Sequence, residues 1–276
     1  GDAGSLTLTA SAFNNREKET YDIQGQYWLN ETNGDEQLGV GSYMEHARNF
    51  LYSSVQTLKL TYDLKKGNHT MQTGIGWKHE KVRENSNEWE YRDSSGYSVP
   101  HTGNDLQLIY NMRATNTINA SHFELFAQDT WRKESNIGIL SLNYGMRLSY
   151  WGWNKEWLVS PRASLGFVPS SNENFTFRLA AGLYNQRPFY KELRDTVTID
   201  GNTTVQLNKN IKSQRSFQVV TGMEYRFKIG GRPFKFTTEA YYKAQWKLNP
   251  YNVDNLKIVY YGNNLATGYV VGADFK

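Results

Sequence analysis

Residues 140–150 alternate strictly between two kinds of side chain. Every second position is apolar or aromatic, namely Leu140, Leu142, Tyr144, Met146, Leu148 and Tyr150. The positions between them are polar or glycine, namely Ser141, Asn143, Gly145, Arg147 and Ser149. Because successive side chains of a β-strand point to opposite faces, this period-two pattern predicts a strand with one apolar and one polar face. Its length exceeds the ~5 to 6 residues usual for strands of soluble proteins.

The same alternation recurs in residues 57–64, 71–78, 175–183 and 234–243. Taken together, the polar phases of these segments carry both glycine and charged residues, as Lys59, Gly76, Arg178 and Lys235 illustrate. This mixture favours a water-filled or lumen-facing wall over the exposed side of a soluble β-sandwich.

Composition excludes several classes of protein. Aromatic residues make up 14% of the chain, but its mean hydropathy is −0.69, and no stretch approaches the ~20 apolar residues of a spanning helix. The 31 basic and 27 acidic residues are scattered along the chain, so nothing supports nucleic-acid binding. There is no cysteine, and the five histidines have no ligand-like spacing. We therefore assign no catalytic residue, metal site or cofactor.

The predicted connections alternate in length. Short turns are expected at residues 65–68, 133–136, 170–174 and 230–233, and long loops at 30–49, 83–119, 187–212 and 248–264. Short turns on one rim and long loops on the other are typical of outer-membrane barrels. Residues 105–113 are assigned to a long loop, because a spanning strand there would move the later tight turns to the opposite rim.

These patterns predict an all-β fold, an antiparallel up-and-down transmembrane β-barrel wall of about eleven strands without any helix. Pro161 lacks the N–H that a central ladder needs, so it is expected near a rim, where pairing is looser. The expected strands begin near Leu6, Tyr21, Leu51, His69, Ala120, Gly138, Trp157, Phe175, Ser213, Phe234 and Ala266.

Several segments together resemble the barrel domain of TonB-dependent receptors, particularly the nutrient-uptake branch that includes starch-utilisation-type transporters. They are residues 159–162 (Val-Ser-Pro-Arg), 182–194, 239–243 (Glu-Ala-Tyr-Tyr-Lys) and 260–276, which contains Gly-Asn-Asn and Thr-Gly-Tyr. Each segment alone is weak evidence, but their order and spacing are fairly specific. The resemblance extends over most of the chain.

Membership of this family would imply a barrel of about 22 strands around a plug domain, of which this chain would supply half. It would also imply the outer membrane, contact with its lipid, and energy from a TonB complex acting through the plug. We find no plug-like segment, no N-terminal coupling box and no C-terminal aromatic residue. We therefore expect residues 1–276 to be a single partial barrel domain of a protein that continues beyond both ends.

Candidate ligand-contacting residues are sought in the expected outer loops, where aromatic, charged and amphipathic side chains mix. They are Trp89, Tyr91, Arg92, Tyr97, His101, Trp151, Trp153, Arg187, Tyr190 and Arg194. Other strand-end aromatics that continue the apolar phase are expected in interfacial girdles: Trp77, Trp131, Tyr150, Trp157 and Trp246. Glu224 and Glu239 share the polar phase with several arginines, which predicts a charged barrel wall and not a hydrolase.

The favoured hypothesis is a transporter fragment that binds and imports a nutrient, with a glycan expected first and a peptide or metal chelate as alternatives. A surface lipoprotein is a further possible partner. A soluble β-sandwich that binds glycans or mediates adhesion is the alternative fold, and an outer-membrane enzyme on a smaller barrel is a third hypothesis. Strand length and the unequal rims separate the first two, while the third lacks a visible catalytic constellation.

Overall fold

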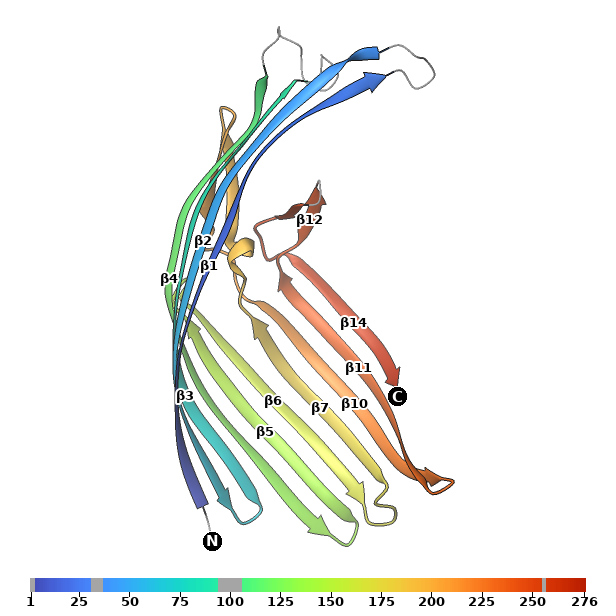
Figure 1. Cartoon of the computed structure of the whole chain (residues 1–276). Helices are drawn as coiled ribbons and strands as arrows, with labels where there is room; N and C mark the ends of the chain where they lie inside the picture. Colours follow the sequence, from blue (N-terminus) through green and yellow to red (C-terminus); the bar gives the residue numbers. More distant parts are fainter. Residues whose placement is uncertain (1–2, 31–36, 94–105, 255–256) are drawn as a thin grey trace.

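The computed structural model describes residues 3–30, 37–93, 106–254 and 257–276. Its main body is one curved antiparallel sheet of ten strands, each paired with the next strand of the path (Figure 1). The ten strands are β1 (Ala3–Asn30), β2 (Gln37–Lys66), β3 (His69–Asp93), β4 (Gln107–Ser135), β5 (Gly138–Trp151), β6 (Glu156–Pro169), β7 (Phe175–Gln186), β10 (Gln214–Ile229), β11 (Arg232–Leu248) and β14 (Ala266–Phe275). This all-β antiparallel wall confirms the predicted fold class, and the sheet is open because the outer edges of β1 and β14 have no partner strand among the described residues.

Two small additions lie on this wall. The connection from β7 to β10 contains a short 3-10 helix, η1 (Tyr190–Leu193), and a hairpin of β8 (Arg194–Ile199) and β9 (Asn202–Leu207). A second hairpin, β12 (Tyr251–Asp254) and β13 (Lys257–Tyr260), precedes β14. The prediction that no helix would occur was therefore wrong by this one turn. Among the described residues, no helix is long and apolar enough to cross a membrane.

One face of the sheet is apolar because the pairing registers bring the apolar phases of neighbouring strands together. Leu8 lies opposite Leu60, Leu60 opposite Ile75, Ile75 opposite Leu125, and Leu125 opposite Leu148. These side chains remain open, with Leu8 66% and Ile75 55% exposed. Since apolar area left in water costs about 25 cal/mol per Å², this face suits lipid tails. We call it the lipid-side face, and the opposite, concave one the lumen-side face.

Aromatic side chains border the lipid-side face at both ends. Near the long-loop end, Trp77 lies opposite Phe123, and Tyr150 packs on Trp157 with ring centroids 4.9 Å apart. Near the tight turns, Phe175, Tyr225, Phe227 and Phe234 form a stack with successive centroid separations of 4.4, 5.4 and 5.8 Å. Two such bands are typical of barrel girdles. Trp131 and Trp246 belong to the same apolar phase, opposite Leu142 and Arg215.

The first four strands are much longer than the sequence pattern predicted. β2 alone runs for 30 residues, about three times the ~9 to 11 residues that cross a bilayer. Leu6 and Tyr21 begin no separate strands, since both lie in β1, and the sheet path has ten members instead of eleven. Residues 37–49, 83–93 and 107–119, which were assigned to loops, are hydrogen-bonded extensions of β2, β3 and β4.

The sequence pattern missed these strand extensions because the alternation of apolar and polar residues disappears there, while the hydrogen-bonded pairing of the backbones continues. Beyond the membrane both faces of a strand contact water or polar loops, so polar residues occupy both phases. Residues 107–113 are thus neither a loop nor a separate spanning strand, but the outer end of β4. Figure 1 shows these extensions of β1 to β4 rising well beyond the shorter strands.

Pro161 lies inside β6, at the point where pairing with β7 stops. β6 pairs with β5 along its whole length, whereas its pairing with β7 begins at Arg162. Beyond that point the Asn185 side-chain amide donates hydrogen bonds to the Val159 carbonyl (2.9 Å) and to the Ser160 hydroxyl (2.9 Å). The loosely paired position expected for this proline is therefore present, although it is created by a gap in the ladder.

The predicted tight turns are confirmed. Residues 67–68, 136–137, 170–174 and 230–231 join consecutive strands. Gly67 has φ 55°, and Gly230 and Gly231 have φ 57° and 79°, a conformation that other residues adopt at a cost.

Candidate functional site

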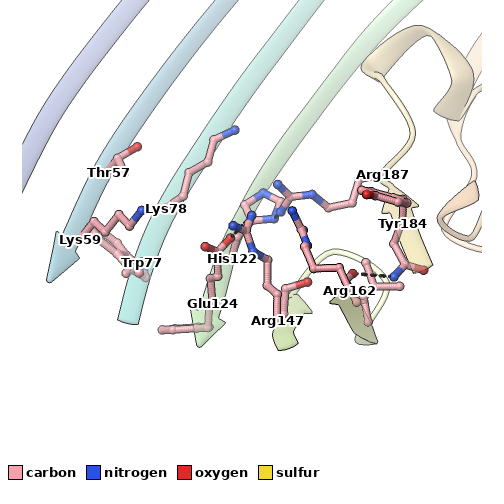
Figure 2. Close-up of a pocket in the computed structure, with 16 residues that line it drawn as sticks. Thr57, Lys59, Trp77, Lys78, His122, Glu124, Arg147, Arg162, Tyr184 and Arg187 are labelled. Carbon is pink, nitrogen blue, oxygen red and sulfur yellow. Dashed lines mark hydrogen bonds and ion pairs between the residues drawn. The ribbon is translucent and has the colours of Figure 1, made fainter. Parts of the chain in front are cut away.

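Basic side chains gather in the middle of the lumen-side face. We call them the basic band, and they come from five different segments: Lys59 on β2, Lys78 on β3, Arg147 on β5, Arg162 on β6 and Arg187 directly after β7. They line a shallow cavity of about 290 Å³ whose wall also includes His122 and Tyr184 (Figure 2). The polar phase of the alternation places the four strand residues on this face, and Arg187 lines the cavity from the connection after β7.

Aromatic rings support three of these cations. The Lys59 ammonium lies 4.8 Å from the ring centroid of Phe126, and the Arg147 guanidinium lies 5.7 Å from the same centroid. The Arg162 guanidinium lies 5.4 Å from the ring centroid of Tyr184. Such cation–π contacts orient a cation without neutralising it, although Arg147 is also paired with a carboxylate, that of Glu124.

His122 connects the basic band to the loop above it. Its ring is buried, stacks on Trp151 with a centroid separation of 6.0 Å, and accepts a hydrogen bond at Nδ1 from the Arg187 guanidinium. Its Nε2 lies 3.2 Å from a carboxylate oxygen of Glu80. The His122 ring thus lies between the Arg187 guanidinium and the Glu80 carboxylate. Burial lowers the pKa of the Arg187 guanidinium.

The cavity wall carries a net positive charge. Glu124 lies 3.5 Å from Arg147, and Glu80 lies 3.7 Å from Lys78. Five cations therefore face two carboxylates at this level of the wall. A concave wall of one predominant sign focuses the field and raises the local concentration of ligands of the opposite sign.

The segment from residue 187 to residue 212, which we call the loop lobe, folds onto the lumen-side face above the basic band (Figure 1). Its Leu193 and Ile211, each 1% exposed, pack with Val82, Ile118 and Trp151 of the wall. β9 also pairs in parallel with β4 over Met112–Ala114. That edge of β4 is free because β5 ends at Trp151, opposite His122, so the lobe covers an edge that would otherwise be unpaired.

A buried carboxylate anchors the lobe to β3. Glu84 is 8% exposed. Its carboxylate accepts a hydrogen bond of 2.5 Å from the Tyr190 hydroxyl and forms an ion pair with Arg194 at 3.2 Å. Burial, together with the Glu84 carboxylate, raises the pKa of the Tyr190 hydroxyl above its ordinary value. The hydroxyl therefore keeps the proton that it donates.

A second set of hydrogen bonds holds the C-terminal end of the lobe. The buried Glu156 carboxylate accepts hydrogen bonds from the backbone N–H and the hydroxyl of Ser213, at 2.9 and 2.7 Å. The Asn264 side chain bonds both polar backbone groups of Lys212, at 2.7 and 3.0 Å, and the carbonyl of Lys247 at 2.8 Å. The Gly-Asn-Asn segment thus joins two long connections.

The structure brings together only part of the residue set that was predicted to contact ligand. Arg187, Tyr190, Arg194, Trp151 and Trp153 meet at the loop lobe. Of these, Arg187 alone lines the cavity of the basic band, while Trp151 is 4% exposed and structural.

The remaining predicted residues lie elsewhere. Trp89 and Tyr91 belong to the opposite phase of β3, and Trp89 stacks on His46 with a centroid separation of 4.7 Å. Arg92 points to the lumen side, where it pairs with Glu90. Tyr97 and His101 fall outside the described residues.

The sequence prediction missed Lys59, Lys78, Arg147, Arg162 and His122 as site residues. The alternation puts the four strand cations in the polar phase. It does not show that the registers between neighbouring strands bring these four side chains to the same height on the wall. Lower on the wall, Glu224 is paired with Arg226 (2.7 Å), Arg178 (3.6 Å) and Lys235 (3.8 Å), the charged wall that was expected there. In the described part of the chain, no cluster of three or more His, Asp or Glu side chains could hold a metal ion.

Comparison with known families identifies the wall. Residues 1–265 match the family model described as TonB dependent receptor-like, beta-barrel. The chain belongs to the TonB-dependent receptor family. This is a family of receptors and transporters, not of enzymes, and its barrels place the chain in the cell outer membrane. No curated protein sequence matches the chain significantly.

The comparison with solved structures concerns the fold alone. The RagAB peptide importer in its 'closed-closed' state superimposes with a TM-score of 0.56 at 11% identity, over 98% of this chain and 32% of that one. A structure of the RagAB peptide transporter gives 0.54 at 11% identity, with the same coverage. The siderophore receptor PirA from Pseudomonas aeruginosa gives 0.46 at 12% identity, over 97% of this chain and 56% of that one. The chain spans about a third of the length of the first two, and the likeness concerns the fold.

Proposed function

We propose that this chain is part of the barrel of a TonB-dependent transporter that binds a nutrient at the cell surface and imports it, and that the nutrient carries carboxylate groups. The observation that supports this proposal is the basic band, five cations around a lumen-side cavity beside two carboxylates. Arginine and carboxylate form charge-assisted and often bidentate hydrogen bonds. The basic band lies in the middle of the lumen-side face, below the loop lobe, where a ligand that enters the barrel would pass.

Carboxylates fit this wall better than the neutral glycan that the sequence suggested first. A glycan site needs aromatic faces that are open to the ligand. Trp151 is buried. The Lys209 ammonium lies over the Trp153 ring, 5.1 Å from its centroid, so that face of the ring is not open to a sugar. Peptides and carboxylate-bearing metal chelates both supply the required anionic groups, and peptide import is the activity stated for RagAB. Glycan import stays a prediction that the experiment below also tests.

The partners of the complete transporter follow from the family. We propose that a plug domain within the barrel couples this chain to the TonB energy complex, and that outer-membrane lipid surrounds its lipid-side face. A surface lipoprotein that covers the long-loop end is a further proposed partner. Residues 1–276 would then form one partial barrel domain.

The test uses the complete transporter that contains this chain, purified in detergent. Calorimetry would measure its affinity for three probes: a pool of aspartate- and glutamate-rich pentapeptides, the same pool with every carboxyl group amidated, and maltohexaose. The double variant Arg147→Gln/Arg162→Gln removes two cations of the basic band. Lys228→Gln, at the tight-turn end of β10, is the matched control.

We expect the acidic pool to bind, and the double variant to weaken it by roughly 10- to 100-fold, as for lost hydrogen bonds to a charged group. The control should bind like the parent protein. Equal binding of acidic and amidated pools, or an unchanged affinity in the double variant, would refute a carboxylate site. Tight binding of maltohexaose alone would return the proposal to a glycan.

A further inference from the structure

Two cations of the basic band have no anionic partner. Arg147 and Lys78 pair with carboxylates, and Arg187 donates to a histidine ring. In the part of the chain that the structure describes, no carboxylate forms an ion pair with Lys59 or Arg162. Both side chains line the lumen-side cavity, so each can form a charge-assisted hydrogen bond with an anionic group of a ligand.

The aromatic ring beside Lys59 lies across a neighbouring strand. Phe126 belongs to β4 and pairs in register with Gly74 of β3. A Cβ atom at residue 74 would come within 2.6 Å of the Cε1 atom of Phe126, so the missing side chain at Gly74 makes room for the ring. Lys59 comes from β2, on the far side of β3, and its ammonium reaches a point 4.8 Å from the ring centroid. The glycine thus allows one ring to hold a cation from two strands away.

A second glycine supports Arg162 in the same way. Arg162 of β6 pairs in register with Gly182 of β7. A Cβ atom at residue 182 would lie 3.0 Å from the Cε2 atom of Tyr184 and 3.1 Å from the Cβ atom of Arg162. The Tyr184 ring therefore lies over Gly182, and the Arg162 guanidinium is 5.4 Å from its centroid. Such a contact orients the guanidinium and leaves its N–H donors for a ligand.

The two unpaired cations lie on opposite sides of the cavity (Figure 2). Lys59 reaches the ring of Phe126 above β3 and β4, whereas Arg162 and Tyr184 belong to β6 and β7. Strands are about 4.8 Å apart and side-chain tips converge on a concave wall, so the two charges are separated by roughly 10 to 15 Å. A single carboxylate cannot contact both of them.

We propose that the basic band binds a peptide through two carboxylates, one at Lys59 and the other at Arg162. Carboxylates four residues apart on an extended peptide point to the same side and are about 13 Å apart, at about 3.3 Å per residue. The inference rests on the proposed function and names its class of nutrient, a peptide with two spaced acidic residues. A compact chelate with neighbouring carboxylates engages only one of the two cations.

The experiment uses the complete transporter in detergent and measures affinities by calorimetry. The spaced diacid, acetyl-Asp-Gly-Gly-Gly-Asp-amide, carries its two carboxylates four residues apart. The adjacent diacid, acetyl-Gly-Gly-Gly-Asp-Asp-amide, has the same composition and charge. The monoacid, acetyl-Asp-Gly-Gly-Gly-Asn-amide, has one carboxylate. Lys59→Gln and Arg162→Gln each remove one of the two cations, and Lys228→Gln is the matched control.

We expect the spaced diacid to bind the parent protein roughly 10- to 100-fold more tightly than the monoacid, because its second carboxylate adds a charge-assisted hydrogen bond and its linker spans the two cations. The adjacent diacid should bind more like the monoacid, since its carboxylates cannot span the cavity. In Lys59→Gln and in Arg162→Gln the advantage of the spaced diacid should disappear. Lys228→Gln should keep it.

Two substitutions of Tyr184 test whether its ring positions Arg162. Tyr184→Leu removes the ring and should abolish the advantage of the spaced diacid, while the monoacid, which can use Lys59, should bind nearly as before. Tyr184→Phe keeps the ring and should retain the advantage. A merely structural role would instead lower the affinity for all three peptides alike. Heat-modifiable migration on gels verifies that the variants are folded.

The outcomes separate this inference from the proposed function. If no acidic peptide binds the parent protein, the carboxylate site itself is refuted. Equal binding of the spaced and adjacent diacids would leave a carboxylate site but overturn the two-point arrangement. The arrangement also fails if the spaced diacid keeps its advantage in Lys59→Gln or Arg162→Gln. Equal losses in Tyr184→Leu and Tyr184→Phe would show that the ring does not position Arg162.

Discussion

Replacement of Tyr190 by phenylalanine tests whether the loop lobe is held by the buried Glu84 carboxylate. The substitution removes one hydroxyl, which donates a hydrogen bond of 2.5 Å to Glu84, and leaves the ring in its place. Glu84 keeps its ion pair with Arg194 at 3.2 Å, so the charge stays compensated. The change therefore isolates one hydrogen bond to a charged acceptor.

The size of the effect follows from the chemistry of that bond. A hydrogen bond to a charged group contributes about 1.5 to 3 kcal/mol, and the loss should favour opening of the lobe by roughly 10- to 100-fold. Opening is a local event because the lobe rests on the wall through a small core of Leu193 and Ile211. The unfolding of the whole barrel should hardly change.

Hydrogen exchange with mass spectrometry on the complete transporter measures this opening. Amides of residues 187–212 should exchange roughly 10- to 100-fold faster in Tyr190→Phe, while those of β5 and β6 keep their rates. The matched control is Tyr251→Phe, because Tyr251 is 59% exposed in the β12–β13 hairpin. If the lobe amides exchange at the parental rate, Glu84 does not anchor the lobe, and the argument from this contact fails.

Two further predictions concern the same lobe and the lipid-side face. Burial raises the pKa of Glu192 from its ordinary 4.5, against the opposing hydrogen bonds from Phe189 and Gln214. The docked lobe thus holds this proton more tightly than the open one, so opening should become easier as the pH rises from about 4.5 through the raised pKa. Glu192→Gln should abolish that pH dependence of hydrogen exchange, and a dependence that persists would assign it to another group. On the lipid-side face, Leu125 is 53% exposed, and Leu125→Arg should destabilise the barrel in lipid vesicles by about 2 to 4 kcal/mol. Urea unfolding would measure this, with Leu125→Phe as the control, and equal stabilities would contradict the assignment of this face to lipid.

Within the membrane zone, the sequence was sufficient to predict the wall. The two phases of residues 140–150 became the two faces of β5, and the tight turns at Gly67 and Gly230 joined the strands that the alternation outlined. This works because a bilayer imposes one apolar face on every strand, and side chains record that constraint directly.

Outside the membrane zone, the same method failed for a physical reason. Residues 14–30 of β1 and 107–119 of β4 have polar residues in both phases, since water contacts both faces. Their backbone ladder is nevertheless complete. The sequence therefore divided β1 into two strands and assigned the outer end of β4 to a loop.

The functional sites show the same division. The sequence alone determined which side chains face the lumen and which face the lipid, because strand geometry fixes that choice residue by residue. Only the tertiary structure decided that Lys59, Lys78, Arg147, Arg162 and Arg187 meet around one cavity. Those meetings depend on the register between strands and on the docking of the loop lobe. Both are set by contacts between residues far apart in the chain, which a local pattern does not record.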